Sequence, residues 1–260
     1  MAAAIASLVS LILIMAGAWL LIERTRQSGF ADMIWSAGTG VVSAALALWL
    51  MQTNTTWRPA ILAALMLVWG LRLASHILAR RHGGDDPRYA ALRRDWGASA
   101  PRRMFFFLQS QAIAGWFLSI GVLVGAMAQS PLSWLDALGI VICLIALWGE
   151  RMADRQLAQF RTTQKGGVCD VGLWSRSRHP NYFFEWLFWV GIMAIGFNAL
   201  LPLMLLALIP PVIMYVLLVH VSGIPPLEKY MLESRGEAFR AYQKRVPAFF
   251  PRLFSSGAGR

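Results

Sequence analysis

Residues 172–197 read GLWSRSRHPNYFFEWLFWVGIMAIGF, a polar stretch that runs directly into an apolar one. The polar half holds two arginines, a histidine, an asparagine and a tyrosine, and Glu185 follows at the start of the apolar half. A charge at such a place is costly unless a partner or a ligand compensates it, so ionisable residues of membrane segments mark functional sites by default. The stretch 172–185 is therefore the first candidate for a functional site.

The composition is that of a membrane protein. Hydrophobic residues make up 57% of the chain and only 14% of residues are charged, whereas about a quarter of residues are charged in soluble domains. No internal repeat and no polar segment long enough to fold alone is visible, so we predict a single transmembrane domain over 1–260. The two cysteines form neither a disulfide framework nor a metal-ligand spacing, and no metal site is predicted.

Seven segments are apolar enough to cross a bilayer, for which roughly 20 residues are needed. We therefore predict an all-α integral membrane protein with seven transmembrane helices. The segments are 2–22, 33–51, 60–78, 105–127, 134–152, 182–197 and 200–221.

Lysine and arginine concentrate in the first, third and fifth loops and in the tail, whereas the second, fourth and sixth loops offer only Arg58. Because cytoplasmic loops hold the excess of these residues, the N-terminus is predicted outside and the C-terminus in the cytoplasm. The net charge of +11 then lies almost wholly on one face. Attraction to anionic lipid explains most of it, and no motif indicates a nucleic-acid partner. The alternative is that some arginines hold the phosphates of a cofactor.

Several polar residues lie inside or at the ends of the predicted helices. Glu150 and Asp154 are four apart and share a helix face, with Arg161 two turns further on. Arg72 and His76 are also four apart, and Arg72 lies deeper than snorkelling explains. These sets are either a functional site or solvated helix ends with internal ion pairs. For Asp32, Gln109 and Gln111, hydrogen bonding between helices is the simpler role.

No glycine-rich turn follows a strand, and no P-loop, zinc-protease or nucleophile-elbow motif is present. A Rossmann domain is therefore excluded, and any nucleotide must be held by helices and loops. The stretch that follows Tyr230 and runs to Pro247 alternates apolar with basic residues, which suits a helix along the membrane surface.

The second half of the chain, 149–251, resembles the superfamily of integral-membrane reductases and methyltransferases that share an R-H-P-x-Y motif. The motif is Arg178-His179-Pro180-Asn181-Tyr182, with Glu185 behind it. Gly172-Leu173-Trp174 precede it, and Glu228 and Phe239-x-x-Tyr242 follow. The motif is shared by steroid 5-alpha-reductases and sterol reductases, which use NADPH, and by isoprenylcysteine carboxyl methyltransferases, which use S-adenosylmethionine.

The first half resembles the bacterial branch of the steroid 5-alpha-reductase family. The residues that carry this likeness are Asp32-Met33-Ile34-Trp35, Arg72-Leu73 and Asp86-Pro87-Arg88-Tyr89. The resemblance implies that 149–251 binds the cofactor and that helices within 1–148 form the substrate side. One departure is Trp69, which stands where the animal enzymes have a tyrosine that hydrogen-bonds the substrate ketone.

The expected function is that of an NADPH-dependent reductase of the carbon–carbon double bond in a 3-keto-4-ene steroid or similar lipid enone. The expected setting is a bacterial inner membrane, with a cytoplasm-facing cofactor site and no obligate protein partner. The candidate cofactor-binding residues are Arg72, His76, Asp154, Arg161, Arg178, His179, Asn181, Tyr182, Glu185 and Glu228. The candidate catalytic residues at the substrate end are Asp32, Trp69 and Gln109. Two alternatives are a membrane methyltransferase that uses S-adenosylmethionine and a non-catalytic lipid-binding or transport protein.

Overall fold

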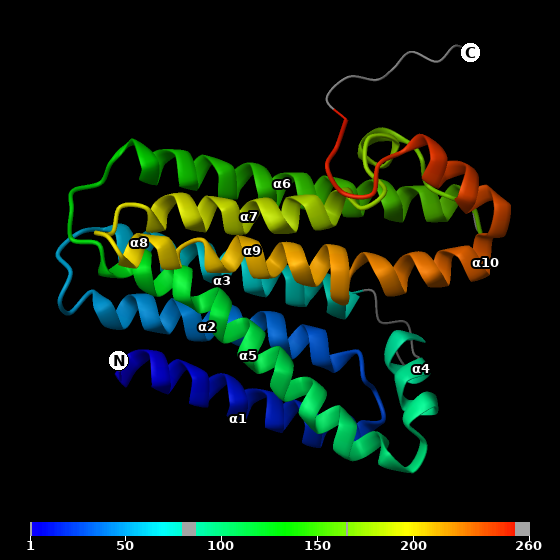
Figure 1. Cartoon of the computed structure of the whole chain (residues 1–260), viewed down its shortest axis with the longest axis horizontal. Coiled ribbons are helices and arrows are strands. Elements are labelled where there is room, and N and C mark those ends of the chain that lie inside the picture. The colour runs from blue at the N-terminus through cyan, green and yellow to red at the C-terminus, as the bar shows by residue number, and fades with distance from the viewer. Residues whose placement is uncertain (1, 80–86, 165, 253–260) are drawn as a thin grey trace. The chain divides into compact units, whose positions relative to one another are not determined.

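The computed structural model describes residues 2–79, 87–164 and 166–252, and within these ranges every regular element is helical (Figure 1). The predicted all-helical class is thereby confirmed. Asp86, the first residue of one quoted motif, lies outside the described residues.

Ten helices and three short helical turns follow one another along the described chain. The helices are α1 (Ala2–Thr25), α2 (Phe30–Leu50), α3 (Arg58–Ala79), α4 (Pro87–Trp96), α5 (Ala100–Met127), α6 (Trp134–Thr163), α7 (Pro180–Gly196), α8 (Leu203–Leu206), α9 (Ile209–Val216) and α10 (Ile224–Arg245). The turns are η1 (Gly97–Ser99), η2 (Gly172–Ser175) and η3 (Leu217–Val221).

Five helical stretches in the described part of the chain are long and apolar enough to cross a membrane. They are α1, α2, α3, the stretch Tyr89–Met127 and the stretch Leu203–Arg245. The other two predicted spans, 134–152 and 182–197, are also helical, within α6 and α7. Because α7 has only 17 residues, it is shorter than the usual span of about 20 residues. The count of seven and the orientation stay predictions.

The chain divides into two compact units. Unit 1 comprises Met1–Leu138 and Ile192–Ile213, and unit 2 comprises Gly139–Gly191 and Met214–Arg260. Residues 192–213, which belong to the predicted part 149–251, lie in unit 1, so the two units do not coincide with the predicted parts 1–148 and 149–251. The functions predicted for these two parts stay predictions.

In unit 1, α2 packs against α1, α3 and α5 (Figure 1). The backbones of α2 and α3 come very close where two glycines meet: a Cβ on Gly40 would lie 3.0 Å from the Cα of Gly70. Small residues allow such contacts between membrane helices. Between α1 and α5 the core is apolar and includes Leu11, Met15 and Leu108.

In unit 2, α6 and α7 pack closely along their length. A Cβ on Gly191 would lie 2.7 Å from the carbonyl oxygen of Gly139, and one on Gly149 would overlap the ring of Phe184. Pro180 begins α7, where its missing N–H costs nothing because a first-turn N–H has no helical partner. The chain after α10 is tied back to the segment before α7, since the N–H of Arg178 donates to the Pro247 carbonyl at 2.9 Å.

Candidate functional site

The polar ends of α6 and α7 lie at the same level of the helix pair in unit 2. The contact between Gly149 and Phe184 sets the antiparallel register, so Glu150 lies near the level of the first turns of α7. Asp154 is one turn further along α6 on the same face, and Asn181 and Glu185 are one turn apart on α7. The predicted residues Asp154, Asn181 and Glu185 therefore belong to one polar end of this pair.

Two carboxyl groups of this pair are buried. Glu150 is 5% exposed and Glu185 is 6% exposed. Glu185 accepts a hydrogen bond from the indole Nε1 of Trp189, one turn along α7, at 3.2 Å. Asn181, Tyr182 and Asp154 are half-buried. Glu150, which was read from the sequence only as part of a polar stripe, is thus as deeply placed as the predicted Glu185.

Arg178 and Glu228 connect the start of α7 to α10. The guanidinium donates to both carboxylate oxygens, from Nε at 2.7 Å and from Nη2 at 3.1 Å. Its Nη1 donates to the carbonyls of Gln243 and Val246 at 3.2 and 2.6 Å. Four of the five N–H donors of an arginine are therefore used inside the protein. This leaves one for the predicted contact with a cofactor phosphate.

His179 shares the same carboxylate. Its Nε2 lies 2.9 Å from Oε1 of Glu228, and the ring stacks on Tyr182 with centroids 5.5 Å apart. Burial lowers the pKa of His179, against the opposing effect of the Glu228 carboxylate. The ring is therefore neutral near pH 7, with its proton on Nε2, and Nδ1 is an acceptor. Nδ1 is buried and has no hydrogen-bond partner among the described residues, so a ligand that brings a donor could bind there.

Glu228 lies beyond the apolar run that ends at Val221. Burial acts to raise the pKa of its carboxyl, but the hydrogen bonds from His179, Arg178 and Gln243 outweigh burial and lower the pKa to about 2. The group is therefore a carboxylate at any physiological pH. Its role in the structure is to fix the tautomer of His179 and the orientation of Arg178.

Two further arginines lie near the loop between α6 and η2. Arg161, near the end of α6, is exposed. Arg235 on α10 has a buried Nε with no hydrogen-bond partner in the described ranges, and its Nη1 is 3.9 Å from the position of a Cβ on Gly166. Arg235 was missed by the sequence reasoning because its surroundings indicated only a membrane-surface helix.

The predicted substrate-end residues lie in unit 1. Tyr89 donates a hydrogen bond to Oδ1 of Asp32 at 2.6 Å, and Gln111 Nε2 donates to the Tyr89 hydroxyl at 3.2 Å. Trp69 is fully buried and packs edge-on against Trp35, with ring centroids 6.2 Å apart. Trp35 in turn donates to the carbonyl of Gln111 at 2.8 Å. Asp32 and Trp69 thus belong to one neighbourhood.

Gln109 points elsewhere. Residues two apart on a helix lie about 200° apart around its axis, so Gln109 and Gln111 face different sides of α5. Both polar atoms of the Gln109 amide are buried and lack a hydrogen-bond partner within the described part of the chain. Gln111, and not the predicted Gln109, contacts the pair that Tyr89 and Asp32 form. The sequence pattern did not distinguish these two glutamines.

Arg72 and His76 lie on α3 in unit 1, half-buried, and both interact with other groups of the protein. The other predicted cofactor-binding residues belong to unit 2. The cofactor-binding roles of all these residues stay predictions.

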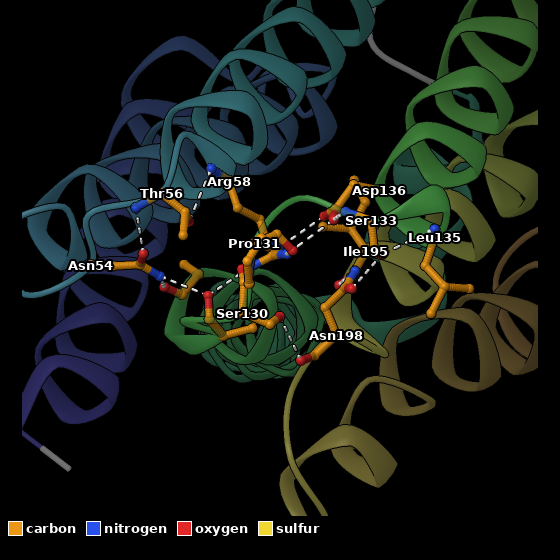
Figure 2. A network of polar contacts seen from close by, with 12 residues as sticks. Asn54, Thr56, Arg58, Ser130, Pro131, Ser133, Leu135, Asp136, Ile195 and Asn198 are labelled. Atoms are coloured by element: carbon orange, nitrogen blue, oxygen red, sulfur yellow. Dashed lines mark hydrogen bonds and ion pairs between the residues drawn. The ribbon is translucent and has the colours of Figure 1, made fainter.

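A second polar cluster in unit 1 is a structural network. Figure 2 shows Arg58 surrounded by Asp136 and by the chain that joins α5 to α6. Arg58 is 0% exposed and Asp136 is 3% exposed. Asn54 donates to the carbonyls of Ala126 and Ala128 at 2.8 and 2.9 Å. The side chains of Arg58, Asp136 and Asn54 therefore hold the loops of unit 1 together.

A family model described as "Protein of unknown function (DUF1295)" matches residues 18–246 of the chain. No curated protein and no solved structure matches it.

Proposed function

We propose that this chain, which belongs to the DUF1295 family of proteins of unknown function, is a membrane-embedded, NADPH-dependent reductase of a carbon–carbon double bond in a steroid-like lipid enone. The observation that carries the proposal is the polar end of the α6 and α7 pair in unit 2. His179 Nδ1, a buried acceptor that has no hydrogen-bond partner within the described ranges, lies there next in sequence to the first turn of α7. The resemblance to steroid 5-alpha-reductases supplies the reaction class.

The residues of unit 2 fit the chemical groups of a dinucleotide. Ribose hydroxyls and a carboxamide bring donors, for which Asp154, Glu185 and His179 Nδ1 offer acceptors. The amide of Asn181 both donates and accepts, which suits the carboxamide. Phosphates need cations, and Arg161 and Arg235 supply them.

When bound, a dihydronicotinamide supplies a hydride to the β-carbon of the enone. Negative charge then develops on the substrate's ketone oxygen, where a fixed donor stabilises it. A proton that reaches the α-carbon completes the reduction. In unit 1 the buried Gln109 amide is the donor proposed for this oxygen, whereas Asp32 and Trp69 lie in a different neighbourhood. By the loop charges, the proposed location is an inner membrane with the polar end of α6 and α7 on the cytoplasmic side.

A methyltransferase that uses S-adenosylmethionine is the second candidate. The buried carboxyl groups of Glu150 and Glu185 favour it, because carboxylates also suit a cationic sulfonium. A transport protein is less well supported. Arg58 and Asp136 are the polar pair near the predicted outer end, and they are bound to each other and so do not line a path.

The test uses the purified full chain in detergent. Thermal unfolding is measured with NADPH and with S-adenosylmethionine, since a ligand of the folded state raises the melting temperature. NADPH oxidation is then followed by absorbance with testosterone, a 3-keto-4-ene steroid. We expect stabilisation by NADPH alone and oxidation that depends on the steroid.

Asn181→Ala and Asp154→Asn are expected to weaken NADPH binding at least tenfold. Asp170→Asn is the matched control, because Asp170 lies in the same unit and pairs only on the surface with Arg245 at 3.1 Å. Stabilisation by S-adenosylmethionine in place of NADPH would replace the reductase by the methyltransferase. Unchanged NADPH binding in both site variants would refute the assigned residues.

A further inference from the structure

Polar side chains form a stripe between α2 and α5 in unit 1. We call the α2/α5 stripe the set of Asp32, Thr39 and Ser43 on α2 with Gln111 and Ser119 on α5. At one end, the hydroxyls of Ser43 and Ser119 hydrogen-bond to each other at 2.8 Å. One turn before Ser43, the hydroxyl of Thr39 is fully buried and has no partner among the described residues. Helical threonines commonly bond the preceding turn, so this hydroxyl is unusual.

At the other end of the α2/α5 stripe, the side chains in contact offer more hydrogen-bond acceptors than donors. The Nε2 of Gln111 donates a hydrogen bond to the Tyr89 hydroxyl, and this hydroxyl donates to Asp32. The remaining amide oxygen, Gln111 Oε1, is buried without a hydrogen-bond partner in the described chain. A buried acceptor in this state carries a desolvation cost.

The two unsatisfied groups belong to levels one helical turn apart along α5. Gln111 and Gly115 are one turn apart on α5, which separates their Cβ positions by roughly 5–6 Å. The hydroxyl of Thr39 is 2.6 Å from the position of a Cβ on Gly115. A side chain at position 115 would displace Thr39, whereas glycine lets its hydroxyl face α5 one turn from Gln111, with the indole Nε1 of Trp35 3.2 Å from the same position.

We propose that the α2/α5 stripe binds the hydroxyl group of a lipid between Gln111 and Thr39. An alcohol completes both groups at once, since its proton goes to Gln111 Oε1 and its oxygen accepts from the Thr39 hydroxyl. A ketone can only accept, and it leaves Gln111 Oε1 unsatisfied. Asp32 and Gln111 are half-buried while Thr39 is fully buried, so the alcohol enters from the Asp32 end.

This inference rests on the proposed function for the steroid-like nature of the ligand and adds the group by which the ligand is held. The substrate is a lipid enone that also carries a hydroxyl away from the reacting double bond. The hydroxyl is recognised in unit 1 and takes no part in the reduction.

The test is equilibrium binding to the full chain in detergent, without cofactor, read by quenching of tryptophan fluorescence. Three probes share the 3-keto-4-ene ring: testosterone has a 17-hydroxyl, androst-4-ene-3,17-dione has a 17-ketone and androst-4-en-3-one has neither. Testosterone is expected to bind about tenfold more tightly than either of the others, the effect of one well-made hydrogen bond. Thr39→Val, which keeps the shape and removes the hydroxyl, is expected to abolish the preference and to raise the melting temperature of the empty protein.

Ser43→Ala is the matched control, one turn away on the same helix. It breaks a satisfied pair, so it lowers the melting temperature and keeps the preference for testosterone. Gln111→Met tests the second partner if the Thr39 variant does not fold. Equal binding of the three steroids, no binding of any, or a preference that survives Thr39→Val overturns the inference. The last result would mean that the steroid hydroxyl is recognised at another place.

NADPH oxidation is measured separately on the same variants. A hydroxyl preference in a protein that never oxidises NADPH would refute the reductase and keep the alcohol site. Oxidation of NADPH without a preference for the hydroxyl would keep the reductase and refute the alcohol site.

Discussion

Arg58 and Asp136 form a buried, bidentate ion pair in which Nε donates to Oδ1 at 2.7 Å and Nη2 donates to Oδ2 at 3.0 Å. The other donors of the guanidinium go to the carbonyls of Ala128, Ser130 and Pro131. The loop between α5 and α6 is therefore wrapped around one side chain at the start of α3. All five N–H groups are satisfied, which is the condition under which a buried charge is tolerated.

Removal of one member of this pair leaves an uncompensated buried charge. Arg58→Met is expected to lower the free energy of unfolding by about 3–5 kcal/mol, measured by SDS titration in mixed micelles. The double variant Arg58→Met, Asp136→Leu is expected to be more stable than the single one. Arg240→Met is the control, since its pair with Glu237 is exposed and is worth about 0–1 kcal/mol. Equal effects of the buried and exposed variants would contradict this account.

The carboxylate of Glu228 makes stability depend on pH at the acid end. Its pKa falls from 4.5 to about 2 on folding, so the unfolded chain binds the proton more readily. The stabilisation is fully present above pH 4.5 and is lost as pH falls towards 2. We expect the difference in melting temperature between wild type and Glu228→Gln to shrink between pH 5 and pH 3. A difference that stays constant over this range would show that Arg178 does not depend on the charge.

Length and apolarity predicted most of the helices, because a run of about 20 apolar residues has few alternatives in a membrane. The helix α4 was not predicted, since its sequence is polar and its place depends on packing against α5. The short α8 was likewise read as part of one long span.

Within the site, spacing could predict only groups on the same helix. Asp154 was placed with Glu150 because the two are four residues apart. The bond from Arg178 to Glu228 joins residues 50 apart, and no local pattern reveals that the motif arginine is largely used inside the protein. The same holds for Tyr89 and Asp32, which are 57 apart, and for the choice between Gln109 and Gln111.

The contact between α6 and α7 depends on a glycine. A Cβ on Gly149 would overlap the ring of Phe184, whereas one on Gly17 in α1 would meet no atom within 4 Å. Gly149→Ala is expected to destabilise the protein by about 1–3 kcal/mol and to weaken NADPH binding, because it shifts the level of Glu150 against Asn181. Gly17→Ala is expected to stabilise by about 0.5–1 kcal/mol through lower chain entropy and to leave binding unchanged. If both alanines have the same effect, the register is not set at this glycine.

Replacement of the Gln109 amide is expected to change stability and activity in opposite directions. Its nitrogen and oxygen are buried without a hydrogen-bond partner in the described residues, which costs about 1–3 kcal/mol. Gln109→Leu keeps the volume and removes that cost, so the melting temperature of the empty protein is expected to rise. If the amide stabilises charge on the substrate's ketone oxygen, the same variant lowers kcat by about a hundredfold or more and leaves NADPH affinity unchanged. Gln159→Leu, on the exposed side of α6, is expected to change neither quantity. A Gln109→Leu protein with wild-type kcat would remove Gln109 from the reaction, and a lower melting temperature would show that its amide has a partner after all.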